Sequence, residues 1–266
     1  MHALAQIHDW AGGSGAVVVG SEGVLGEQGV LDRAGRWASV TKLATSYAAL
    51  IAVESGVLDL EEPAGPPGAT LRHLLAHASG LPFEGSDPIA PPGRRRIYSN
   101  AGFDLIGAVI DDRTPHGFAT YLQERVLGPL GIVAELQGRP SEGLFGNVRG
   151  IALLGMELLA PSLLAPGTLA TARTVAFRGL KGTLPGVGRY DNLDWGLGPE
   201  IRADKSPHWM GTTNSPATFG HFGGSGAFLW VDPVPKLALA VVSGREFGPW
   251  ALSAWPILSD SVLASA

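Results

Sequence analysis

The sequence predicts an α+β fold in which an antiparallel sheet is flanked by helices, so that an α/β lobe lies beside an all-helical lobe. Two strand-like runs occur near the two ends of the chain, at residues 15–29 and 226–244, and the segments between them show helical periodicity. Strands so far apart in sequence most simply belong to one antiparallel sheet. We therefore expect a sheet lobe with N- and C-terminal helices from residues 1–58 and 205–266, and a mostly helical lobe from residues 59–204, which together make one functional unit.

The composition indicates a globular protein without a nucleic-acid surface. The chain has 266 residues, of which 45% are hydrophobic and 16% charged, and its formal net charge is -5. This length is ample for a well-buried core in one large domain or two coupled lobes. A negative charge without a basic stripe argues against nucleic acid as a partner. Because there are no cysteines, disulfides, thiol catalysis and thiolate metal sites are excluded.

The sequence predicts neither a secretion signal nor a membrane span. Residues 1–13 lack the basic region and the apolar run of a signal peptide. The most apolar segment, residues 150–167, is interrupted by Glu157, Pro161 and Pro166, and it falls short of the ~20 apolar residues that cross a bilayer. We therefore expect a cytoplasmic protein with no membrane partner.

The first 82 residues are predicted to contain two strands and two helices. Residues 15–29 read as two short strands around a Ser-Glu-Gly turn. A helix runs from Ser39, a residue type that caps helices, to the stop residue Gly56. Its apolar residues recur at three- and four-residue steps and predict an amphipathic face: Val40, Leu43, Ala44, Tyr47 and Ile51. Residues 68–82 predict a short helix that is ended by a glycine and a proline.

The rest of the chain continues with helices and ends with two strands and a final helix. Helical periodicity covers residues 98–114, 118–132 and most of 150–181. Residues 182–217 are rich in Gly, Pro and Asn, so we expect irregular structure there. Residues 226–244 predict two strands joined by Asp-Pro-Val-Pro, and a final helix is expected from Trp250 to about Leu263. We find no internal repeat.

Ser39 and Lys42 are three residues apart at the start of a predicted helix. Lys42, one of only 4 lysines, would fall in the first turn, where the helix dipole disfavours a positive charge and lowers a lysine pKa. Residues three apart on a helix are neighbours, so the hydroxyl and the amine can meet as nucleophile and base. Alone, however, Ser-x-x-Lys is a weak signal, and a capping serine with a solvated lysine is the better explanation of the isolated motif.

Two further short motifs strengthen the functional interpretation. Tyr98-Ser99-Asn100 follows a Pro-Pro-Gly turn and opens a predicted helix, and His221-Phe222-Gly223 lies just before the strand predicted at residue 226. Each motif lies at the boundary of an element, where side chains are held by the scaffold yet face a cleft. A cleft between two lobes is a common place for an active site.

In this order and context, the three motifs resemble those of the penicillin-recognising serine hydrolases. Within that family, the class C β-lactamases, DD-peptidases and related carboxylesterases carry Ser-x-x-Lys, Tyr-x-Asn, and Lys-Thr-Gly or His-x-Gly. The stretches LRHLLAHASGLP and FGHFGGSGAFLWVDP are also similar to family segments, and the likeness extends over about residues 15–245. It implies the β-lactamase/transpeptidase-like fold, which agrees with the predicted sheet and helical lobe. It implies no metal and no organic cofactor.

The chemistry of these residues, read with the resemblance, gives each one a role. Ser39 would attack a carbonyl and become acylated, while Lys42 would accept the serine proton. Tyr98 would pass that proton to the leaving group and later activate water. Asn100 would hold Lys42 or the substrate, and His221 would orient the substrate or Tyr98.

The resemblance also implies an oxyanion hole, and the third motif departs from the family pattern. By resemblance, the backbone N–H groups of Ser39 and Gly224 would bind the oxyanion, and Gly223 would let substrate approach the strand closely. Phe222 stands where Thr or Ser is usual, and His221 stands where β-lactamases usually have Lys. The chain is also short for the class C group, so loops that bind large substrates are expected to be missing.

Several other residues match functional patterns less well. Tyr190-Asp191-Asn192 also fits Tyr-x-Asn but opens no helix. His73 and His77 are four apart on a predicted helix, yet no glutamate or third ligand supports a zinc site, so we expect packing and hydrogen-bonding roles. Arg94–Arg96 could bind a substrate carboxylate, although a solvated turn is the simpler interpretation. The chain has no Gly-x-Ser-x-Gly elbow, which disfavours the α/β-hydrolase design.

We therefore predict a serine hydrolase that forms an acyl-enzyme on Ser39 and acts, like a carboxylesterase, on small ester or amide substrates. A β-lactamase or D-amino-peptide hydrolase is the alternative enzyme. A catalytically silent binding member of the family is the alternative of another class, but a binding role needs no base beside a hydroxyl. The natural substrate, its chirality and the oligomeric state are left open by the sequence.

Overall fold

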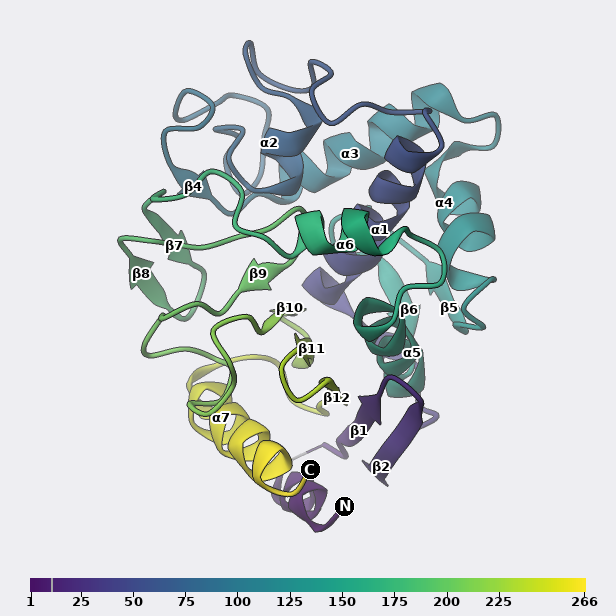
Figure 1. The fold of residues 1–266 in the computed structure, drawn as a ribbon, viewed down its shortest axis with the longest axis vertical. Coiled ribbons are helices and arrows are strands. Elements are labelled where there is room, and N and C mark those ends of the chain that lie inside the picture. Colours follow the sequence, from purple (N-terminus) through teal and green to yellow (C-terminus); the bar gives the residue numbers. More distant parts are fainter. Residues whose placement is uncertain (11) are drawn as a thin grey trace.

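A six-stranded antiparallel sheet forms the centre of the computed structural model, which describes residues 1–10 and 12–266. The strand order is β2-β1-β12-β11-β10-β9, so strands from the two ends of the chain lie side by side (Figure 1). The bounds are β1 (Gly15–Gly20), β2 (Gly23–Gly29), β9 (Glu200–Ile201), β10 (Phe219–Phe222), β11 (Ala227–Asp232) and β12 (Leu237–Val242). The pairing of β1 with β12, in which Gly15 lies opposite Val242, confirms the predicted single sheet.

Alternate residues of the central strands enter two different hydrophobic cores. In β1, Val17 and Val19 join one core, whereas Ala16 and Val18 join the other. The first core contains α1 (Thr41–Glu54) and α5 (Val148–Leu159), and the second contains the N-terminal 3-10 helix η1 (His2–Asp9) and α7 (Pro249–Ala264). Because both faces of the sheet are covered, its inner strands are apolar at nearly every position.

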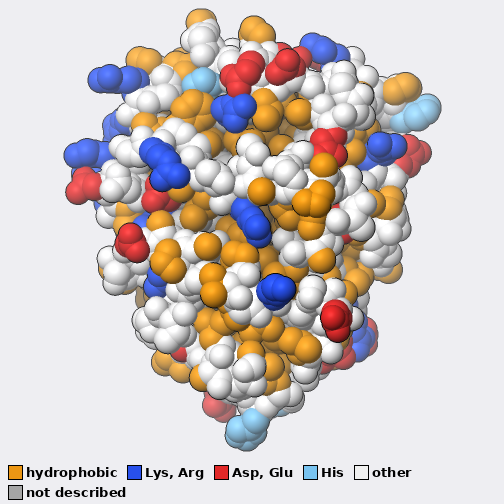
Figure 2. All heavy atoms as spheres, in the orientation of Figure 1, with side chains coloured by type: hydrophobic (Ala, Val, Ile, Leu, Met, Phe, Trp, Pro, Cys, Tyr) orange, Lys and Arg blue, Asp and Glu red, His pale blue; other side chains and the backbone are white. Residues whose placement is uncertain are grey.

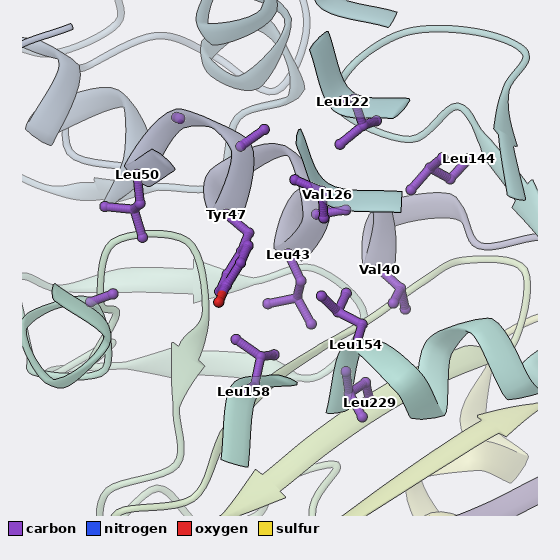
Figure 3. Packing of buried hydrophobic residues seen from close by; sticks show 14 of the residues in the cluster. Val40, Leu43, Tyr47, Leu50, Leu122, Val126, Leu144, Leu154, Leu158 and Leu229 are labelled. Atoms are coloured by element: carbon purple, nitrogen blue, oxygen red, sulfur yellow. The ribbon is translucent and has the colours of Figure 1, made fainter. Parts of the chain in front are cut away.

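Helix α1 is buried on all sides, which differs from the amphipathic helix predicted for this segment. Every residue from Thr41 to Ala52 is buried. Figure 3 shows Val40, Leu43, Tyr47 and Leu50 among side chains from α5, the β11 strand and the segments around residues 122–144. The prediction failed because small Ala, Ser and Thr residues occupy the other faces of the helix and allow close packing all round.

The start of α1 also differs from the prediction. Ser39 lies in a 3-10 turn, η2 (Ala38–Val40), that precedes the helix, and its side chain caps no helical N–H. Ala38 has a positive φ of 46°, a backbone conformation that non-glycine residues rarely adopt and that tends to occur at functional sites. Lys42, in the first turn of α1, nevertheless lies within hydrogen-bond distance of Ser39, as the three-residue spacing predicts.

The other helices and two small sheets surround α1. The helices are α2 (Leu71–Leu75), α3 (Asn100–Arg113), α4 (Gly117–Leu122) with the π-helical turn η3 (Gln123–Leu127), and α6 (Pro166–Ala172). One three-stranded sheet contains β3 (Gly35–Arg36), β6 (Leu144–Gly146) and β5 (Ala134–Leu136). The other contains β4 (Arg96–Ile97), β7 (Gly182–Leu184) and β8 (Gly188–Tyr190).

Several predicted elements are confirmed and others need correction. The strand pairs at both ends, α3 and α7 appear as expected, but the helix predicted over residues 68–82 covers only α2. The segment predicted to be irregular, residues 182–217, contains β7, β8 and β9, and His221 lies within β10 instead of before the first C-terminal strand. Such strands of two to four residues are too short to show a period of two.

The division into lobes at residues 58 and 205 stays a prediction. Two elements inside the range 59–204 nevertheless adjoin the central sheet, since α5 packs on β1, β11 and β12, and β9 pairs with β10. On the face shown in Figure 2, acidic and basic side chains are interspersed among apolar ones. Among the described residues, no helix combines the length and apolar character needed to cross a bilayer.

Candidate active site

The three sequence motifs meet around one cavity of about 440 Å³. Ser39 from η2, Tyr98 and Asn100 from the start of α3, and His221 and Phe222 from β10 all line it. Lys42 lies directly beneath, and its side chain is fully buried. The structure therefore brings together residues that the sequence places near both ends and in the middle of the chain.

The amine of Lys42 has three polar neighbours. Its Nζ lies 3.2 Å from Ser39 Oγ, 2.6 Å from Asn100 Oδ1 and 3.0 Å from the carbonyl oxygen of Ser141. Burial lowers the pKa of Lys42 from 10.5 to about 7, although nearby carboxylates act in the opposite direction. A large share of the Lys42 side chains is thus neutral at neutral pH.

The contacts of Lys42 direct the lone pair of its neutral form toward Ser39. A neutral amine has two N–H donors and one lone pair. The Asn100 and Ser141 oxygens are carbonyl acceptors that cannot donate, so they take the two N–H groups. The lone pair is then left to accept the Ser39 hydroxyl proton.

Tyr98 is enclosed by aromatic rings and remains protonated. The ring centroids of His77, Trp195 and His221 lie 4.6, 5.8 and 5.7 Å from that of Tyr98. Burial raises the pKa of Tyr98 above its ordinary value, while the neighbouring Ser39 hydroxyl acts in the opposite direction. The phenol therefore keeps its proton at neutral pH and serves as a donor.

His221 is neutral, and its tautomer can be deduced from its contacts. Burial, followed by the positive charge of Lys42, lowers the pKa of His221 to about 3. Its Nδ1 lies 2.7 Å from the carbonyl oxygen of Phe222, so this nitrogen must carry the ring proton. Its Nε2 is then an acceptor, and Tyr98 OH, 3.4 Å away, donates to it. This contact favours the orienting role toward Tyr98 over direct binding of substrate.

The turn that carries Tyr98 and Asn100 is held by hydrogen bonds from three sides. Ser99 Oγ accepts from the N–H of Gly102 and so caps α3. His77, which is buried, accepts the Ser99 N–H on its Nδ1 at 3.0 Å. The Asn100 N–H donates to the carbonyl of Phe83 at 2.9 Å. These bonds explain why the motif opens the helix with two side chains directed to the cavity.

Gly223 and Gly224 bring the end of β10 against the backbone of the serine turn. A Cβ on Gly223 would lie 2.4 Å from the carbonyl oxygen of Trp37 and 3.1 Å from the nitrogen of Ser39, so only glycine fits there. Gly224 is exposed at the cavity, and a Cβ on it would meet nothing within 4 Å.

One wall of the cavity is aromatic. Phe222 is 9% exposed, and its ring centroid lies 4.5 Å from that of Phe247, 5.4 Å from that of Trp209 and 6.0 Å from that of Trp255. Phe83 also lines the cavity, where it is half exposed and stacks on Tyr98 with a centroid distance of 5.9 Å.

Several cavity residues were not predicted from the sequence. They are the aromatic residues Phe83 and Phe247, the apolar residues Leu184 and Pro185, and the charged residues Arg36, Glu142 and Glu246. These residues come from loops and two- or three-residue strands, and no spacing pattern links them to the three motifs. Only the position of Arg36, three residues before Ser39, was a usable signal.

The other candidates of the sequence have structural contacts. Arg96, expected in a solvated turn, is instead buried and donates to four backbone carbonyls, including those of Leu193 and Ala76, while Arg94 and Arg95 are exposed. His73 Nδ1 bonds to Thr70. In the described part of the chain, no group of three His, Asp or Glu side chains is arranged to hold a metal ion.

Comparison with known proteins decides the family. A sequence model described as Beta-lactamase matches residues 32–134 and 132–261. The chain belongs to the Beta-lactamase family. It is thus a serine hydrolase of the β-lactamase-related group, as the resemblance implied, and its α+β fold with an antiparallel sheet flanked by helices is the fold of that family.

The relatives differ in the activities that their names describe. A crystal structure of a β-lactamase from Mycobacterium bovis is 47% identical, superposes with a TM-score of 0.97, and the match covers 99% of this chain and 98% of that one. A D-alanyl-D-alanine-carboxypeptidase/endopeptidase, AmpH, from Escherichia coli is 28% identical over 38% of this chain and 36% of its own length. The monacolin J acid methylbutanoyltransferase of Aspergillus terreus is 30% identical over 40% of this chain and 39% of its own length. The chain thus spans under half of each of these two curated relatives.

Proposed function

We propose that the protein hydrolyses small neutral esters, in the manner of a carboxylesterase, through an acyl-enzyme on Ser39. The geometry of Lys42 carries this proposal. Its buried amine, with a pKa lowered to about 7, lies 3.2 Å from Ser39 Oγ, and its two other contacts are acceptors. A purely binding role would need no base held in this way.

The acylation step follows from the proton positions. Ser39 Oγ attacks the ester carbonyl carbon and forms the Oγ–carbon bond, while the hydroxyl proton of Ser39 passes to Lys42. Tyr98 donates its phenolic proton to the leaving alkoxide as the ester bond breaks, and regains a proton from Lys42. A water molecule then attacks the acyl carbon, and its proton passes through Tyr98 to Lys42. When the Oγ–carbon bond breaks, Lys42 gives that proton to Ser39 Oγ, which restores the hydroxyl and releases the acid.

Backbone N–H groups of Ser39 and Gly224 are the proposed oxyanion hole. Gly223 packs against the Ser39 nitrogen, so the residue after it is near the nucleophile, and Gly224 lines the cavity. One such donor contributes about 3 kcal/mol to stabilisation of the transition state.

The cavity walls favour an uncharged substrate. Phe222 takes the place of a hydroxyl residue, His221 is neutral, and the lining carries two carboxylates, Glu142 and Glu246, against one cation, Arg36. A substrate carboxylate near the third motif would lose water and regain few hydrogen bonds, at a cost of about 1–3 kcal/mol. A neutral ester avoids that cost and can pack on the aromatic wall.

A β-lactam or D-amino-peptide substrate is the second candidate. Arg36 lines the cavity and could pair with a substrate carboxylate. The 47% identical relative is named a β-lactamase, and another relative is named a D-alanyl-D-alanine-carboxypeptidase. The cytoplasmic location, which would argue against cell-wall peptide, stays a prediction.

Labelling of Ser39 tests both candidates. The protein is incubated separately with a fluorophosphonate, a short-chain nitrophenyl ester and a penicillin, and intact mass and peptide mapping identify the acylated residue. We expect fluorophosphonate on Ser39, turnover of the ester, and loss of both in Ser39→Ala. Unchanged ester turnover in Ser39→Ala would remove Ser39 from the mechanism, and efficient penicillin turnover would favour the second candidate.

A further inference from the structure

Two chains of hydrogen bonds lead away from the amine of Lys42 to carboxylates. In the first, Lys42 Nζ lies 2.6 Å from Asn100 Oδ1, and Asn100 Nδ2 donates to Glu84 Oε1 at 3.0 Å. In the second, Lys42 Nζ lies 3.0 Å from the Ser141 carbonyl oxygen, and the Ser141 N–H donates to Asp104 Oδ1 at 3.1 Å. Both acceptors that orient the amine are therefore held in turn by a carboxylate.

Arg139 joins the two chains into a closed ring. Its guanidinium binds Glu84 with two hydrogen bonds of 2.7 Å and lies 3.3 Å from Asp104. A planar guanidinium that binds a carboxylate through both nitrogens fixes orientation as well as distance. We call this set the Arg139 ring, and its members are Lys42, Asn100, Glu84, Arg139, Asp104 and Ser141.

We propose that Arg139 is a positioning residue that aims the lone pair of Lys42 at Ser39, acting through Glu84 and Asp104. The inference rests on the proposed function, in which Lys42 is the base. Arg139 does not line the catalytic cavity, so it acts through other residues and not on the substrate.

The ring fixes which way the Lys42 lone pair points. Glu84 can accept only from the amide nitrogen of Asn100, which leaves the amide oxygen facing Lys42. Asp104 accepts the N–H of Ser141 and thereby fixes the position of the Ser141 carbonyl group, which faces Lys42. If Arg139 is removed, both carboxylates lose their shared partner and both acceptors can move.

The ring also sets the charge around Lys42. Removal of Arg139 takes away a positive charge and leaves unpaired the three carboxylates that it contacts, Glu84, Asp104 and Glu142. The amine of Lys42 should then be harder to deprotonate. Loss of the Glu84 charge should have the opposite effect. The titratable and charged side chains near Lys42 are Glu142, Asp104, Arg139, Glu84, His77, His221 and Tyr98.

The test is the pH dependence of Ser39 labelling by a fluorophosphonate, measured as a second-order rate by intact mass. For Arg139→Met we expect a high-pH plateau that is at least about tenfold lower, because the base is misaligned. We also expect the pH at which the labelling rate reaches half of its plateau to move up by about 0.5 pH unit or more. For Glu84→Gln we expect a lower plateau and a midpoint that moves down.

Arg149→Met is the matched control. Arg149 likewise pairs with more than one carboxylate, namely Glu27 and Asp32. Its side chain is 42% exposed, against 44% for that of Arg139. It should label like the unmodified protein. Should Arg139→Met fail to fold by circular dichroism, Glu84→Gln, which keeps the shape of its side chain, carries the test.

The outcomes separate this inference from the proposed function. Plateaus within twofold of the control, or midpoints that do not move in opposite directions, would overturn the positioning role of Arg139. Absence of Ser39 labelling in the unmodified protein would overturn the proposed function itself, and this inference with it.

Discussion

Replacement of Lys42 by methionine should abolish activity and, at the same time, change how stability depends on pH. Lys42 is fully buried, and burial lowers its pKa from 10.5 to about 7. Between these values the unfolded chain binds a proton that the folded chain does not. The free energy of unfolding of the unmodified protein therefore rises with pH between about 7 and 10.5. Below about pH 7 it carries the full cost of a buried, charged lysine.

The magnitude follows from the two pKa values. At about 1.4 kcal/mol for each pH unit, the gap between 10.5 and about 7 corresponds to about 5 kcal/mol. Roughly 2 kcal/mol of that difference should develop between about pH 9 and about pH 7. A methionine side chain has no charge to desolvate, so Lys42→Met removes this dependence. The substitution also leaves the Asn100 and Ser141 acceptors without a donor, which adds a cost that does not vary with pH.

Urea unfolding at a series of pH values measures the effect. The stability of Lys42→Met relative to the unmodified protein should increase by about 2 kcal/mol as the pH falls from about 9 to about 7. Lys181→Met serves as the control, because Lys181 is 70% exposed and its replacement should leave the pH dependence unchanged. A stability difference for Lys42→Met that is constant with pH would refute the lowered pKa and, with it, the neutral base.

Further substitutions at Lys42, in the third motif and at the two glycines probe the site. The activity of the unmodified protein should rise with pH around a midpoint near 7. Lys42→Arg should lower kcat/KM at least about 100-fold, because a guanidinium stays protonated. Near-native rates for Lys42→Arg would exclude the role of Lys42 as a base. Phe222→Thr should cost about 3 kcal/mol of stability, since its ring is packed among three others. It should also raise the penicillin-to-ester ratio of kcat/KM, and His221→Lys should raise that ratio further; an unmoved ratio in both would contradict the substrate proposal. Gly223→Ala, with a carbonyl oxygen 2.4 Å from the new Cβ, should lower stability by about 2 kcal/mol and reduce activity, whereas Gly224→Ala should keep its melting temperature. Equal melting temperatures for the two alanine variants would show that the close approach is relaxed in solution.

The site could be predicted where its chemistry depends on local spacing. Ser39 and Lys42 are joined by one helical turn, and Tyr98 and Asn100 lie on one helix start, so each pair is visible in the sequence. That the pairs meet followed only from the resemblance to a known family, because no periodicity relates residue 42 to residue 100.

The supporting residues could not be predicted, since their contacts are not local. Glu84, Asp104 and Arg139 come from three separate segments and meet only in the folded chain. Their sequence neighbourhoods resemble ordinary solvated loops and a helix surface. The same holds for Arg96, whose place in a basic run suggested solvent although it anchors four backbone carbonyls.

The pairing of β1 with β12 has a consequence for the order of events during synthesis. Gly15 of β1 lies opposite Val242 of β12. Since translation adds about 5–20 residues per second, β12 emerges from the ribosome long after β1. Until then the segment that carries Ser39 has no β10 beside it, and the glycine contact that completes the cavity is absent. The surroundings of Ser39 are therefore completed only after the C-terminal strands have been synthesised and added to the sheet.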